Sequence, residues 1–114
     1  MRLFSDSLAT LERSLEVRGQ RHAVLAGNVA NADTPGFKPL DIDFETAMAE
    51  GRSGATMAEE NAALAGTPGV DGNTVDVDRA MAALAENGIQ YGAAARAASK
   101  KLAILRYVAG DGVG

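Results

Sequence analysis

The stretch NVANADTPGFKPLDIDF, residues 28–44, decides how this chain of 114 residues is organised. Apolar residues recur at helical spacing up to Val29, and Pro35 then disfavours a helical conformation at the residue before it. The run Thr34–Phe37 is typical of a type II turn, with proline in second place and glycine in third. Pro39 keeps the chain extended directly afterwards. The stretch therefore predicts a rigid corner at which a long helix turns into a short strand.

Polar side chains lie on both sides of this turn. Asn28 and Asn31 can satisfy the free backbone groups where the helix ends. The spacing of two places Asp41 and Asp43 on one face of the expected strand, with Ile42 and Phe44 on the other. We expect a half-buried strand with solvated carboxylates and docked apolar side chains, rather than a pair of catalytic acids.

Two long helices are predicted around the corner. The first runs from about Ser7 to Val29, with Ser5 or Asp6 as its N-cap, and the second from about Val77 to Val108, with Asp76 as its N-cap. Apolar residues in both recur at alternating spacings of three and four, which is a heptad pattern. The expected packing seam consists of Leu8, Leu11, Leu15, Leu25 and Val29 in the first helix and of Val77, Met81, Leu84, Tyr91, Leu102 and Leu105 in the second.

The chain divides into three segments of one structural domain. Residues 1–36 form the N-terminal helix and the Thr-Pro-Gly corner, residues 37–74 a short strand and a flexible acidic loop, and residues 75–114 the C-terminal helix. A short helical piece is expected at 57–65 inside the loop. The predicted fold is mainly α, with the terminal helices forming an antiparallel, coiled-coil-like pair and a short extended segment and a mobile loop between them.

Glycine inside the expected helices is costly. Gly19, Gly27, Gly88 and Gly92 each lower helix stability by about 1 kcal/mol relative to alanine. Two interpretations stay open. In the first, the small residues allow close packing within one subunit; in the second, neighbouring copies complete the helices.

Composition and charge exclude several classes of protein. The net charge is −4, and the middle third carries most of it, with one basic and eight acidic residues in 39–76. This balance argues against nucleic acid as the main partner. The absence of cysteine excludes disulfides and thiolate metal sites. We expect no membrane span and no cleaved leader, because no apolar run is long enough and acidic residues follow closely behind the first apolar ones.

No pattern in the chain predicts catalysis, a cofactor or a metal. His22 is the only histidine and lies on the heptad seam, so we expect a partly buried, hydrogen-bonded structural residue. The run DGNTVD at 71–76 starts like a calcium loop, but Val75 and Asp76 occupy places that require a ligand and a glycine. A turn followed by a helix cap explains this run better.

The corner and the start of the second helix together resemble a known family. GNVANADTPGFKPLDIDF at 27–44 and DGNTVDVDRAMAALAENGIQY at 71–91 are similar to the signature of the bacterial flagellar rod, hook and axial protein family, and most similar to its proximal rod members. The resemblance covers residues 1–49 and 71–108. It assigns the corner motif to Asn28, Asn31, Thr34, Pro35, Gly36, Phe37, Asp41, Asp43 and Phe44, and the start of the C-terminal helix to Asp71, Gly72, Asn73 and Asp76.

The resemblance implies a structural, non-enzymatic role. The chain would be a subunit of the proximal rod of the flagellar basal body, in the periplasm, where it would assemble helically and transmit torque for motility. Its partners would be copies of itself, other rod proteins and the flagellar type III export apparatus, which would export it without a cleaved signal peptide. The alternative is a small helical adaptor or export-chaperone-like protein that binds partners through its amphipathic helices and stays a stable monomer or dimer.

Overall fold

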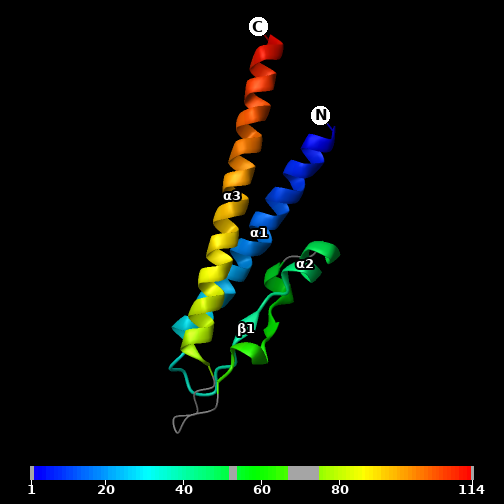
Figure 1. Ribbon diagram of the computed structural model, residues 1–114. Coiled ribbons are helices and arrows are strands. Elements are labelled where there is room, and N and C mark those ends of the chain that lie inside the picture. The colour runs from blue at the N-terminus through cyan, green and yellow to red at the C-terminus, as the bar shows by residue number, and fades with distance from the viewer. Residues whose placement is uncertain (1, 52–53, 67–74, 114) are drawn as a thin grey trace.

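A computed structural model describes residues 2–51, 54–66 and 75–113. Two long helices run antiparallel along the molecule, and a smaller middle segment, residues 39–66, lies against the first of them (Figure 1). This arrangement confirms the mainly α fold and the antiparallel pair. In chain order the elements are α1 (Arg2–Ala30), β1 (Leu40–Asp41), α2 (Phe44–Glu50), η1 (Gly54–Met57), β2 (Glu59–Glu60), η2 (Ala62–Leu64) and α3 (Val77–Val113).

The molecule is a rod rather than a globule. Its principal extents are 70 × 24 × 16 Å and its radius of gyration is 18.2 Å, whereas a compact chain of this length has a radius of about 13 Å. Both termini lie at the same end, where α1 and α3 diverge and α3 reaches farther than α1 (Figure 1). The distal part of α3, residues 102–108, therefore has few neighbours within the subunit.

The helix ends differ in part from the sequence expectation. Asp76 is the N-cap of α3 as predicted, because its Oδ1 accepts a hydrogen bond from the Arg79 N–H at 3.1 Å. The start of α1 was predicted wrongly: the helix begins at Arg2, so Ser5 and Asp6 lie inside it. A cation–π contact, with the Lys101 Nζ 5.1 Å from the ring centre of Phe4, links this first turn to α3.

Helix α1 packs through two faces, of which the sequence interpretation found one. The second face is spaced by four, four, three and four and holds the middle segment. Val17 is fully buried there and forms a core cluster with Ile42 and Ala47. The residues of this second face are Arg13, Val17, Arg21, Val24 and Asn28.

The seam of α3 coincides only partly with its contact on α1. Asn87 and Ala98 are buried, and Leu84 and Leu105 are half-buried. Four residues of the expected seam are instead exposed in the subunit: Val77 (41%), Met81 (54%), Tyr91 (41%) and Leu102 (38%). These side chains are available to contacts outside the chain.

The middle segment contains short helices and strands as well as loops. The expected strand is only two residues long and pairs antiparallel with β2, with Leu40 opposite Glu60 and Asp41 opposite Glu59. Phe44 starts helix α2, so the expectation that it lies on the strand is wrong. Of the helical piece expected at 57–65, Met57 ends η1 and Ala62–Leu64 form η2, whereas residues 59–60 are extended. Residues 52–53 and 67–74, including Asp71, Gly72 and Asn73, lie outside the described residues.

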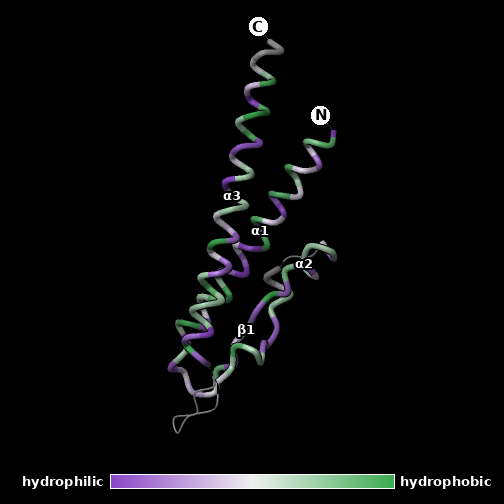
Figure 2. Tube along the Cα trace, viewed as in Figure 1, coloured by the Kyte–Doolittle hydropathy of each residue, from purple (hydrophilic) through white to green (hydrophobic). Residues whose placement is uncertain are grey.

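Hydrophilic and hydrophobic residues alternate along both long helices (Figure 2). In the ranges that the structure describes, no helix combines the length and the apolar character that a membrane crossing requires.

Replacing Val17 by alanine should destabilise the chain by about 2 kcal/mol, because two buried methyl groups are lost and a cavity remains beneath the middle segment. The same replacement at the exposed Val77 should cost less than about 0.5 kcal/mol. Urea unfolding followed by circular dichroism measures both changes. Equal losses at the two positions would show that Val17 does not anchor the middle segment.

Candidate assembly site

Asn28 ties the end of α1 to the strand that follows the corner. Its side chain is fully buried. The Asn28 Oδ1 accepts a hydrogen bond from the Leu40 N–H at 2.8 Å, and its Nδ2 donates one to the Leu40 carbonyl at 2.7 Å. The amide therefore pairs with the backbone of Leu40 as a neighbouring strand would, and it fixes the strand against the helix.

The turn itself is held by a short chain of hydrogen bonds. The Asn31 Nδ2 donates to the Gly27 carbonyl at 2.8 Å, and the Asn31 Oδ1 accepts from the Thr34 hydroxyl at 3.1 Å. The Phe37 N–H then donates to the Thr34 carbonyl at 3.2 Å. Gly36 has φ of 76°, a conformation that residues with a side chain rarely adopt. The predicted type II turn is confirmed.

An apolar cluster lies under the corner. Ala32, Val75 and Ala80 are buried together, and Val29 and Phe37 pack against them. The cluster joins the end of α1 to Val75, two residues before α3, and to the first turn of α3. The corner thus holds both long helices at one end of the molecule.

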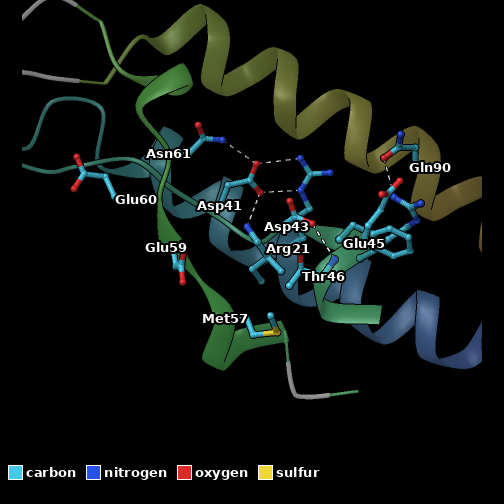
Figure 3. A pocket seen from close by; sticks show the side chains of 13 residues that line it. Arg21, Asp41, Asp43, Glu45, Thr46, Met57, Glu59, Glu60, Asn61 and Gln90 are labelled. Atoms are coloured by element: carbon cyan, nitrogen blue, oxygen red, sulfur yellow. Dashed lines mark hydrogen bonds and ion pairs between the residues drawn. The ribbon is translucent and has the colours of Figure 1, made fainter. Parts of the chain in front are cut away.

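A bidentate ion pair fastens the middle segment to α1 (Figure 3). The Arg21 Nε donates to the Asp41 Oδ1 at 2.7 Å and the Arg21 Nη2 to Oδ2 at 3.0 Å, while the Ile42 N–H adds a third bond at 2.7 Å. The hydrogen bond with Asp41 raises the pKa of Arg21. The expectation of a solvated carboxylate is therefore wrong for Asp41, because its partner comes from the unrecognised second face of α1.

Asp43 is exposed, as expected, and it also stabilises the start of a helix. Its Oδ1 accepts a hydrogen bond from the Thr46 N–H at 2.9 Å and so caps α2. Hydrogen bonding from Thr46 lowers the pKa of Asp43. The two aspartates of the DIDF run thus anchor the strand and start the helix, respectively.

Arg18 connects three elements. Its guanidinium lies 3.8 Å from the ring centre of Phe44, and its Nη1 donates to the Gln90 Oε1 at 2.8 Å. Burial, followed by the nearby charge of Arg21, lowers the pKa of Arg18. Arg18 therefore links α1, α2 and α3.

His22 and Asn87 form a polar layer between the two long helices. The Asn87 Nδ2 donates to the Arg18 carbonyl at 3.0 Å and lies 3.3 Å from the His22 Nδ1. Asn87 is fully buried, whereas His22 is more exposed than the expected partly buried residue. A single buried amide between helices is a known means of fixing their register.

The groove of Figure 3 is acidic and open. Asp43, Glu45, Glu59 and Glu60 line it beside Arg18 and Arg21. Within the described residues no group of three or more histidines and carboxylates could hold a metal ion. The ion pair, the cap and the cation–π contact all serve to position the middle segment.

Large apolar side chains remain uncovered on α3. Ile89 is 72% exposed and Tyr107 71% exposed, and Leu3 at the start of α1 is 86% exposed. A helix with apolar residues on several sides is characteristic of one that is surrounded by other elements, and exposed apolar patches mark interaction sites. The uncovered apolar residues of α3 are Val77, Met81, Ile89, Tyr91, Leu102, Ile104, Tyr107 and Val108.

Comparison with known proteins places these features in one family. Residues 9–38, which end just beyond the corner, match the family model described as "Flagella basal body rod protein". The chain is 36% identical to the flagellar basal body rod protein FlgB of Escherichia coli K12, over 70% of this chain and 75% of that protein. The corresponding protein of Aeromonas hydrophila is 37% identical over 77% and 80%, and that of Cereibacter sphaeroides 35% identical over 77% and 81%.

Replacing Asn28 by alanine should destabilise the chain by about 2–4 kcal/mol, because the Leu40 N–H and carbonyl both lose their partner. The matched change Asn31→Ala should cost less than about 1 kcal/mol, since water can replace the lost hydrogen bonds to the Gly27 carbonyl and the Thr34 hydroxyl. Thermal unfolding of both variants compares the two losses. Similar losses would contradict the bridging role of Asn28.

The Asp43 carboxylate should titrate below the ordinary aspartate value of about 4. Because its pKa is lowered in the folded chain, the cap contributes stability above the unfolded value and loses it as the pH falls through the folded one. A carbon-detected NMR titration of the Asp43 carboxyl measures the pKa. In the variant Thr46→Pro, which removes the donor N–H, the value should return toward 4, and an unshifted wild-type value would refute the cap.

Proposed function

We propose that this chain, which belongs to the FlgB family of flagellar basal body rod proteins, acts as a stiff structural link that passes torque along the proximal rod. It is a structural subunit of the rod of the flagellar basal body. The proposal for its mechanism rests chiefly on one observation: the long helices α1 and α3 cover only part of their apolar side chains within the subunit. The remainder requires neighbours.

Assembly with copies of itself and with other rod proteins would bury these side chains. Each square ångström of apolar surface removed from water stabilises an assembly by about 25 cal/mol. This gain must exceed the entropy lost when the subunit is ordered. The distal part of α3 has few neighbours within the subunit, so we expect it to become fully ordered only in the assembly.

Stiffness would follow from the length of the helices and from the corner. Helix α3 has 37 residues, which corresponds to about 55 Å at 1.5 Å per residue. Asn28 and the Arg21–Asp41 pair attach the middle segment to α1 by several bonds of 2.7–3.0 Å. A load on one helix is thereby shared with the rest of the subunit.

Family membership also supports a route to the rod. We infer that the chain is exported by the flagellar type III apparatus without a cleaved leader and joins the rod in the periplasm. We infer further that the role involves no catalytic step, because the charged groups of Arg18, Arg21, Asp41 and Asp43 are engaged in an ion pair, a helix cap and a cation–π contact.

The double variant Pro35→Ala with Gly36→Val tests this role in cells. The gene is returned to a strain that lacks its own copy, and swimming in soft agar, cellular protein level and isolated basal bodies are measured. We expect normal expression of the variant but no incorporation and no motility, since valine is strained at φ of 76° and the turn loses its proline.

Gly51→Val is the matched control, because Gly51 also has positive φ, 66°, but lies at the end of α2 away from the corner. This control should swim. Normal swimming of the corner variant would contradict the role of the turn, and failure of the wild-type gene to restore motility would contradict the function itself.

A further inference from the structure

The glycines of the long helices are not required by the packing of the subunit itself. A Cβ atom at Gly19 would lie 3.6 Å from the Tyr91 Cε2, and one at Gly88 would lie 3.6 Å from the His22 Cε1. Both are ordinary contact distances, and alanine at these positions would favour the helix. Close packing within one subunit therefore does not explain either glycine.

These two glycines face each other across a groove. Gly19 and His22 of α1 and Gly88 and Tyr91 of α3 line a mainly apolar groove of about 400 Å³. Gly19 is two residues from Val17, a rotation of about 200° around α1, so the groove lies away from the face that holds the middle segment. Nothing in the described part of the chain fills it.

We propose that this groove receives the distal part of α3, residues 102–108, from a second copy of the chain. The proposal rests on the proposed function and names the partner of its assembly surface. The distal part carries bulky apolar side chains that are exposed in the subunit, among them Ile104 and Tyr107. The groove supplies the complementary shape, because the missing Cβ atoms let a neighbouring helix approach closely.

The charges of the two surfaces support this occupant. Glu12 and Glu16, both exposed, precede Gly19 at helical spacing and so lie on the same face of α1 as this glycine. Glu16 also forms an ion pair with Arg13 at 3.7 Å. The distal part of α3 carries the exposed Arg106, and the exposed Lys100 lies just before it. Opposite charges on the two surfaces attract and orient the approaching copies.

The proposed contact propagates instead of closing. The groove lies at Gly19 and Gly88, toward the middle of the helix pair, and its occupant lies near the C-terminal end of α3. The two surfaces are different patches of one subunit, so the contact is heterologous. A pair of copies therefore still has one free groove and one free distal end, to which further copies can add. Repetition of such a contact produces an open helical array.

The double variant Gly19→Ala with Gly88→Ala separates folding from assembly. In dilute solution the full-length variant should melt at least about 5 °C above wild type. Its self-association by sedimentation equilibrium should be about tenfold weaker, because two methyl groups occupy the groove. Gly27→Ala is the control: its Cβ meets nothing within 4 Å and it does not line the groove, so it should raise the melting temperature without weakening association. Association equal to wild type in the double variant would overturn the proposal.

The absence of cysteine allows the contact to be mapped directly. Met81→Cys, two helical turns from Gly88, is mixed with Tyr107→Cys and treated with a short bis-maleimide. Cross-linked mixed dimers should exceed those formed between Tyr107→Cys and the α2 control Ala49→Cys by about tenfold. No excess would overturn the proposal. If the wild-type gene still restores motility in that case, the function stands and only this partner assignment fails.

Discussion

The pairing of the Asn28 side chain with the backbone of Leu40 is the constraint on which the rest of the structure depends. It joins the last turn of α1 to the strand at distances of 2.7 and 2.8 Å, in a position closed to water. An amide that is buried without such partners would be costly, so the pairing is made only when helix, turn and strand are all in place. The Arg21–Asp41 pair just beyond the turn holds the same strand against α1.

The same constraint divides the surface of α1. One face holds the middle segment through Val17 and Arg21, and another packs on α3. A third side of the helix pair contains the groove at Gly19 and Gly88. Helix α3 also has more apolar side chains than contacts within one subunit cover. Membership in the FlgB family agrees with this surplus, because assembly with other rod proteins would cover it.

The sequence predicted the large features because they are local. Heptad spacing indicated two long helices, and Thr34–Phe37 determined the turn from four adjacent residues. The role of Asp41 was missed because its partner, Arg21, is 20 residues away and was not recognised as part of a second face of α1. The heptad pattern also did not separate the α3 seam residues that pack within the subunit from those that stay exposed. Periodicity shows that a helix has apolar sides, but it does not show which of them a neighbour within the same chain covers.

Hydrogen exchange at single amides tests most sharply whether the corner is ordered in the single subunit while the end of α3 needs neighbours. In dilute solution we expect strong protection of the Leu40 amide, which is bonded to Asn28, and fast exchange of the α3 amides at 99–108. In assembled rods these distal amides should become protected. Equal and strong protection of both regions in the dilute chain would contradict this expectation, because α3 would then be complete without neighbours.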